Sequence, residues 1–163
     1  MEPVLPLTHP LTLFHVALSL VAILAGLVVL RGLLASNPIP RWTHAFLWTT
    51  VATTLTGFLF PFKGVTPAFG TGVVSTIVLV PTLFALYGRK LTGAWRKVFV
   101  IGAMISLYLN VFVLVAQTFL KVPAVHALAP TQAEPPFAIA QGVVLLVFVV
   151  LTIVAVRRAR VLR

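Results

Sequence analysis

The stretch 106-SLYLNVFVLVAQTFLK-121 decides the fold, because it is an apolar helix-length run that nevertheless carries large polar side chains. One helical face would hold the polar positions Ser106, Asn110 and Gln117, which recur at i, i+4 and i+11. In a soluble helix these groups would face water. In a membrane they must face neighbouring helices, since polar groups are costly against lipid tails.

Composition favours the membrane interpretation. Hydrophobic residues make up 60% of the 163 residues and charged residues only 9%, against about 25% charged in ordinary globular chains. There is no Asp and no Cys, and the carboxylates are Glu2 and Glu134. Thiolate metal sites, iron–sulfur clusters, paired-carboxylate catalysis and acid-oriented nucleophilic triads are therefore excluded.

Five apolar runs are each long enough, or nearly so, to cross a hydrocarbon core that needs about 20 helical residues. The sequence predicts an all-α membrane bundle with one domain and transmembrane helices over 11–34, 42–60, 70–88, 95–120 and 138–156. Pro10, Pro40 and Pro136 stand at or just before helix starts, and Pro61 ends the second run. Pro81 lies inside the third run and predicts a kink there.

The basic residues predict the orientation. With five spans and an outer N-terminus, the cytoplasmic side holds Arg31, Arg41, Arg89, Lys90, Arg96, Lys97, Arg157, Arg158, Arg160 and Arg163, and the outer side holds Lys63 and Lys121. This asymmetry is typical of the positive-inside rule and predicts a cytoplasmic C-terminus. The net charge of +10 thus indicates attraction to anionic headgroups, and no nucleic-acid partner is expected.

Every predicted span has one small or polar stripe, and the polar members gather in the outer half of the membrane. The pattern predicts a ligand-binding pocket there, covered by the loop 121–136 with a short interfacial helix in its first half. Its predicted lining is His15, Ser19, Thr53, Thr56, Ser75, Asn110, Gln117 and Gln141. The alternative is that these groups only link helices, since such hydrogen bonds commonly serve as glue.

The histidines leave a second functional class open. His15 and His126 both belong to the outer side and can hold a b-type haem, a metal or a quinone if the outer loop folds back over the bundle. His44, beside Arg41 and Trp42, is read as a headgroup-level anchor.

Three segments carry a resemblance to known proteins. "NPIPRWTHAFLWTTVATTLTGFLFPF", "LYGRKLTGAWRK" and "LNVFVLVAQTFLKVPAVHALAPTQAEPPFAIAQ" are similar to a group of small uncharacterised multi-spanning bacterial inner-membrane proteins with no assigned activity. The R-x-x-H at 41–44 also resembles cytochrome-like membrane bundles, although those carry matched histidines on neighbouring spans.

Together these features predict a non-enzymatic protein of the bacterial inner membrane. It would bind, with or without transport, a small or amphipathic ligand or a partner subunit. The alternative is a membrane redox protein that holds haem b or quinone near His15. Partners are expected to be the lipid bilayer, a membrane protein or a second copy.

Overall fold

The computed structural model describes residues 9–60 and 67–159, and these residues form helices and connecting turns with no strand. The long helices are α1 (Pro10–Leu34), α2 (Pro40–Phe58), α3 (Pro67–Leu83), α4 (Trp95–Lys121) and α6 (Pro135–Ala159). A π-helical turn, η1 (Phe84–Gly88), continues α3, and the short α5 (Pro123–His126) follows α4. The prediction of an all-helical bundle is confirmed. Lys63, Arg160 and Arg163, which the charge pattern placed on particular sides, lie outside the described residues.

Prolines set most of the helix starts. Pro10, Pro40, Pro67, Pro123 and Pro135 each open a helix. A first-turn residue has no intrahelical acceptor for its N–H, so proline loses nothing there and its fixed φ favours the helix.

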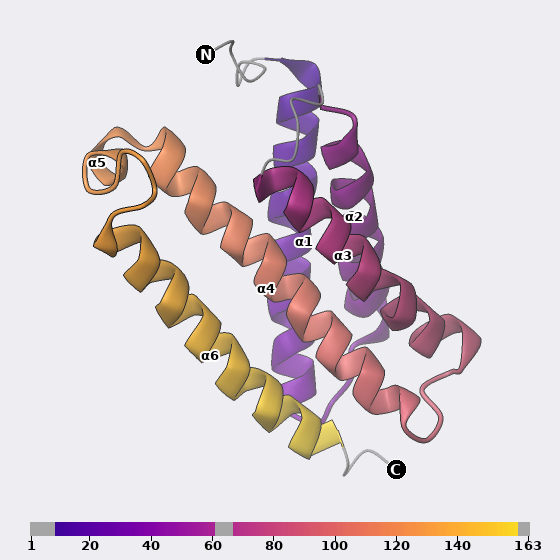
Figure 1. Ribbon diagram of the computed structural model, residues 1–163. Helices are drawn as coiled ribbons and strands as arrows, with labels where there is room; N and C mark the ends of the chain where they lie inside the picture. Colours follow the sequence, from indigo (N-terminus) through magenta and orange to yellow (C-terminus); the bar gives the residue numbers. More distant parts are fainter. Residues whose placement is uncertain (1–8, 61–66, 160–163) are drawn as a thin grey trace.

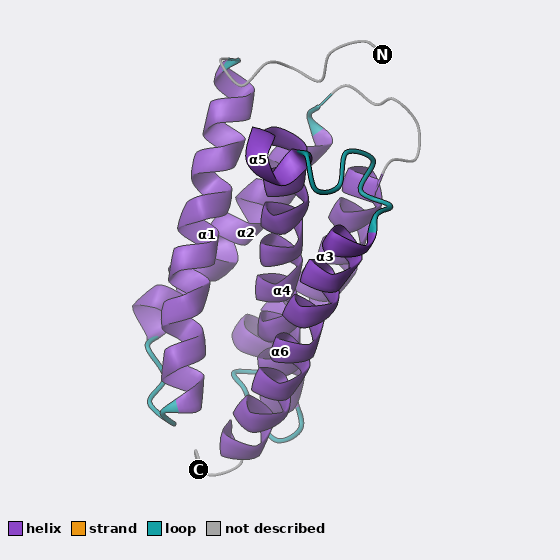
Figure 2. Ribbon diagram, turned by 90° about the vertical axis from the view of Figure 1, so that its left-hand side faces the viewer, coloured by secondary structure: helices purple, strands orange, loops and turns teal. Residues whose placement is uncertain are grey.

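The long helices alternate in direction along the chain, and α4 lies at the centre (Figure 1). α4 packs against α1, α2, α3 and α6, whereas α1 packs most extensively against α2. In a second view the helices run roughly along one common direction, with the loops gathered at two ends (Figure 2). The stretch 106–121 therefore belongs to the helix with the most neighbours.

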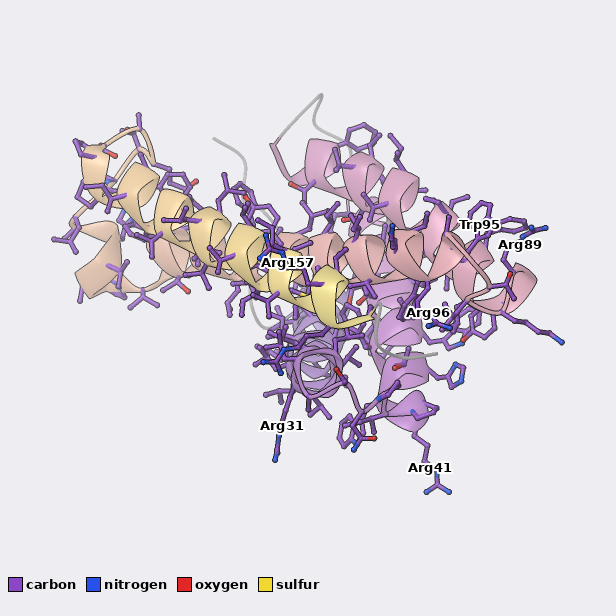
Figure 3. All side chains as sticks on the ribbon, turned by 90° about the horizontal axis from the view of Figure 1, so that it is seen from below. Arg31, Arg41, Arg89, Trp95, Arg96 and Arg157 are labelled. Atoms are coloured by element: carbon purple, nitrogen blue, oxygen red, sulfur yellow. The ribbon has the colours of Figure 1, made fainter. Side chains whose placement is uncertain are left out.

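The two ends of the bundle differ in charge. We call one the basic end: α1 and α6 finish there and α2 and α4 begin there. Its side chains include Arg31, Arg41, Arg89, Arg96 and Arg157 (Figure 3). The other is called the polar end: α1, α3 and α6 begin there and α2 and α4 finish there.

Small residues allow close helix contacts in the middle of the bundle and toward the basic end. A Cβ on Gly26 of α1 would lie 2.5 Å from Leu107 Cδ1 and 2.9 Å from Phe46 Cε2. A Cβ on Gly102 of α4 would overlap the Thr82 hydroxyl of α3. Three helices, α1, α2 and α4, thus meet at Gly26, and α4 meets α3 at Gly102.

Four of the described helices are long and apolar enough to cross a membrane, namely Pro10–Leu34, Phe69–Gly88, Trp95–Lys121 and Pro135–Ala159. Large apolar side chains on their outer faces are exposed, for example Leu24 at 63%, Ile77 at 66% and Leu146 at 66%. A surface of this kind suits lipid rather than water. The helices are those of a membrane protein, and α2 is the long helix that falls short by composition.

Pro81 lies inside α3, and a wider turn follows it before the chain enters α4. Pro81 has no N–H, so the carbonyl one turn earlier loses its usual donor. Three residues later the ladder changes to π spacing, where Arg89 N–H donates to the Phe84 carbonyl at 2.9 Å. Lys90 and Leu91 then take left-handed backbone conformations, with φ of 48° and 58°, to turn the chain into α4.

A carboxylate organises the turn before α6. Glu134 accepts hydrogen bonds from the Thr131 N–H, the Thr131 hydroxyl at 2.9 Å and the Ala133 N–H at 3.1 Å. Desolvation acts to raise the pKa of Glu134, but hydrogen bonds from the backbone and Thr131 outweigh it and lower this pKa below its ordinary value. The ionised side chain therefore holds the start of α6.

Candidate functional site

One polar cluster lies between α1 and α2 near the polar end. The Thr56 hydroxyl is 2.8 Å from the Ala52 carbonyl and donates to it, so the oxygen accepts from His15 Nδ1 at 2.9 Å. This assigns the proton to Nδ1 and leaves Nε2 of His15 with a free lone pair. The Phe60 ring meets the imidazole edge-on at 5.2 Å between centroids.

Two more threonines extend this cluster without using their hydroxyls. Thr12 lies one turn before His15 on α1, and Thr53 lies one turn before Thr56 on α2. Both are buried, at 4% and 9% exposure, yet neither hydroxyl oxygen has a hydrogen-bond partner within 9–60 or 67–159. We call Thr12, His15, Thr53 and Thr56 the α1–α2 polar cluster.

Ser19 and Asn110 have other partners. The Ser19 hydroxyl donates to the His15 backbone carbonyl at 2.8 Å, one helical turn back. Asn110 Nδ2 on α4 donates to Thr50 Oγ1 on α2 at 3.2 Å, and Thr50 donates to the Phe46 carbonyl. Asn110 therefore links α4 to α2 through a buried threonine.

The glutamines lie on the α4–α6 side of the polar end. Gln141 of α6 is 8% exposed and its Nε2 donates to the Phe112 carbonyl of α4 at 3.1 Å. Gln132, in the turn before α6, donates to the Ala116 carbonyl at 2.7 Å. The amide oxygens of Gln117 and Gln141 are buried and have no partner among the described residues.

The eight predicted lining residues thus fall into separate places. His15, Thr53 and Thr56 share the α1–α2 polar cluster, and Asn110 lies between α2 and α4. Ser75 is buried on α3, on the face that also carries Leu79 and Thr82. The hydrogen bond of His15 joins α1 to α2, whereas that of Gln141 joins α6 to α4. A common pocket for all eight stays a prediction, and the α1–α2 polar cluster is its best-assembled part.

The histidines are held by different parts of the molecule. His126 Nδ1–H donates to the Phe119 carbonyl at 3.0 Å, and its helix, α5, packs against α4 alone among the described helices. His15 instead faces α2. Within the described ranges there is no group of three or more His, Asp or Glu side chains that could hold a metal ion.

Sequence reasoning missed the partners of two polar side chains, His44 of α2 and Gln132 of the turn before α6. His44, expected to be a headgroup-level anchor, forms a 2.7 Å hydrogen bond with Tyr87 and stacks on its ring at 5.6 Å. Gln132 sits in a left-handed turn with φ of 60°. A helical-face pattern indicates the side of a helix on which a residue lies but not its partner on another element, so it could not have found these contacts.

Comparison of the chain with protein-family models, with curated proteins and with solved structures finds no match. The function must therefore be argued from the residues themselves.

Proposed function

We propose that this chain is a five-span protein of the bacterial inner membrane with its N-terminus outside and its C-terminus in the cytoplasm. Two observations support five spans rather than four. α2 packs alongside α1 more extensively than any other pair of helices, and the long helices alternate in direction between the two ends (Figure 1). At about 1.5 Å per residue, 19 residues extend for about 28 Å, close to the thickness of a hydrocarbon core.

The hydroxyls of α2 explain how so polar a helix tolerates lipid. Thr43, Thr49, Thr50, Thr54 and Thr56 each donate to a backbone carbonyl four residues back. A hydroxyl that donates to a carbonyl of its own helix presents little unused hydrogen-bonding capacity to lipid. A mean hydropathy value therefore overstates the polarity of this helix. Thr53 is the exception, because its buried hydroxyl has no hydrogen-bond partner among the described residues.

The number of spans can be tested by finding on which side of the membrane each terminus lies. Five spans put the termini on opposite sides of the membrane, and four put them on the same side. A reporter active only in the cytoplasm should be silent at the N-terminus and active after Arg163. Equal activity at both ends would contradict five spans, and the reverse pattern would overturn the orientation.

The function we propose is binding of a small polar or amphipathic ligand at the α1–α2 polar cluster. The observation that carries it is the surplus of hydrogen-bonding capacity there: Nε2 of His15 and the hydroxyls of Thr12 and Thr53. Buried polar atoms in folded proteins nearly always have partners, so an unpaired group is where a ligand or water gains most. The cluster contains no carboxylate that could pair with His15 for catalysis, and we propose binding without a reaction.

Single cysteines test this proposal, because the chain has none of its own. His15→Cys should react with a small charged thiol reagent added from outside. Thr50→Cys, buried at 1% exposure in the core, and Val147→Cys, on the lipid-facing side of α6, should stay unlabelled. If His15→Cys is as protected as Thr50→Cys, the cluster is dry packing and the binding function fails. If a copurifying protein shields it, the occupant is a partner subunit.

A second candidate, quinone or haem at the same place, is favoured by one observation. The Nε2 lone pair of His15, beside the Phe60 ring, suits an axial ligand to haem iron or an acceptor for a quinol hydroxyl. The protein purified from its own membrane should then show a Soret band that disappears in His15→Phe. A colourless protein whose extract contains no quinone would remove this candidate.

A further inference from the structure

A groove opens between α1 and α6 at the basic end, far along the helices from the α1–α2 polar cluster. Its volume is about 420 Å³, within the range of small-molecule sites. Six residues line it: Leu27, Leu30, Arg31, Leu34, Ala35 and Arg158. It therefore combines an apolar wall with two guanidinium groups.

The way in which α1 ends places one of these guanidiniums. Ser36 adopts a left-handed conformation with φ of 54°, Asn37 N–H donates to the Gly32 carbonyl at 2.9 Å, and Ser36 N–H donates to the Leu33 carbonyl. This is a Schellman ending, and it leaves the Leu34 carbonyl free. Arg158 reaches across from α6 and donates Nη1–H to that carbonyl. One of its five donors is used, so the others remain available at the groove.

The arginines of the groove have no carboxylate partner within the described part of the chain. Its one carboxylate residue, Glu134, lies at the polar end and is engaged by Thr131. Arg31 extends away from the bundle at the basic end (Figure 3). Two guanidinium groups without a carboxylate partner, beside an apolar wall, suit a ligand that joins an anionic group to an apolar chain.

The apolar wall continues along α1 away from the charges. Leu27, Leu24 and Leu20 follow one another at helical spacing and are exposed at 46%, 63% and 45%. A chain lying on this stripe would begin at the arginines and run toward the middle of the bundle. The arrangement matches an anionic headgroup followed by an acyl chain.

We propose that the α1–α6 groove is a binding site for an anionic phospholipid, with the phosphate on Arg31 and Arg158 and an acyl chain along Leu27 and Leu24. Clusters of arginine between membrane helices recognise anionic headgroups through such contacts. This site is separate from the proposed ligand site near His15 and does not depend on it.

Native mass spectrometry of the detergent-purified full chain tests the site. The protein is equilibrated with equal amounts of phosphatidylglycerol and phosphatidylcholine that carry the same acyl chains. The wild type should retain phosphatidylglycerol preferentially, and Arg31→Gln should lower that preference about fivefold. Arg31→Gln/Arg158→Gln should lower it further. The matched control, Arg41→Gln/Lys97→Gln, removes the same charge from the basic end outside the groove and should keep the preference.

Three outcomes of this experiment would contradict the proposed lipid site. If the control lowers the preference as much as the double variant, diffuse surface charge is responsible and the groove is no site. If Arg31→Gln, with unchanged helical circular dichroism, keeps the wild-type preference, the proposal is overturned. If glycerol phosphate displaces the lipid at equal concentration, the apolar wall contributes nothing and the lipid assignment fails.

Discussion

The basic and polar halves of the bundle are built from the same helices but are packed by different means. Toward the basic end, Gly102 of α4 lies against Thr82 of α3, and Gly32 of α1 lies against the Asn37 carbonyl of the loop that follows it. Toward the polar end, a Cβ on Gly70 or Gly142 would meet nothing within 4 Å. Gly72 is an exception at the polar end, since a Cβ on it would lie 3.1 Å from the Phe58 ring. The tightest glycine contacts thus lie toward the basic end, and the glycines of the polar end leave more room.

The two halves also differ in how fully their buried side-chain oxygens are hydrogen-bonded. Five buried side-chain oxygens lack a partner in the described residues, and all but that of Ser106 belong to the polar half: those of Thr12, Thr53, Gln117 and Gln141. In the tighter part of the bundle, Thr50 and Thr82 are nearly fully buried and donate to carbonyls of their own helices. Packing thus accounts for stability in the basic half, while the polar half keeps hydrogen-bonding capacity that packing does not use. This difference is why we assign ligand binding to the polar half.

The largest expected effect comes from removing the close approach at Gly102. Gly102→Ala places a methyl group against the Thr82 hydroxyl and Cβ, so α3 and α4 must separate. Overpacking of this kind destabilises by about 1–3 kcal/mol. Gly142→Ala, which adds the same methyl group in open space, is the matched control. Denaturant titration of helical circular dichroism measures both, and equal stability of the two variants would contradict the contrast between the halves.

Much of the fold was predictable from sequence because apolar runs and prolines are local signals. The run 138–156 became Pro135–Ala159, and 95–120 became Trp95–Lys121. The kink at Pro81 stays a prediction. The π turn that follows at Phe84–Gly88 was not predicted, since the sequence shows that a hydrogen bond is lost but not how the neighbouring carbonyls find new donors.

The candidate site was less predictable, because helical periodicity gives the face of a residue but not the helix opposite it. Asn110 and Gln141 were both assigned to inward faces, and both side chains do contact other helices. Their partners, Thr50 on α2 and the Phe112 carbonyl on α4, follow from which helices are neighbours. Hydroxyl behaviour is equally hidden: Thr53 and Thr56 look alike in sequence, yet only Thr56 bonds to its own helix and to His15.

A medium effect is expected at the link between α4 and α2. Asn110→Leu removes the hydrogen bond to Thr50, and interhelical bonds of this type contribute about 0.6 kcal/mol in membranes. Thr50→Val removes the same bond from the other side. A double-mutant cycle should therefore give a coupling of about 0.6 kcal/mol between the two positions. A coupling near zero would mean that Asn110 is held by packing alone.

The smallest change in stability, and the sharpest separation of function from packing, is expected at Thr53. Its hydroxyl is buried without a partner, so Thr53→Val removes a group that gains nothing from the fold. Burying such a group is unfavourable, and its removal should leave the free energy of unfolding unchanged or raise it slightly. Thr56→Val, one turn away, loses the acceptor for His15 and should lower stability instead. If the polar cluster holds a ligand, Thr53→Val should also slow the labelling of His15→Cys, because a less polar cluster is less accessible to a charged reagent. Unchanged stability with unchanged labelling would make Thr53 a bystander. A clear loss of stability would mean that its hydroxyl already serves the fold.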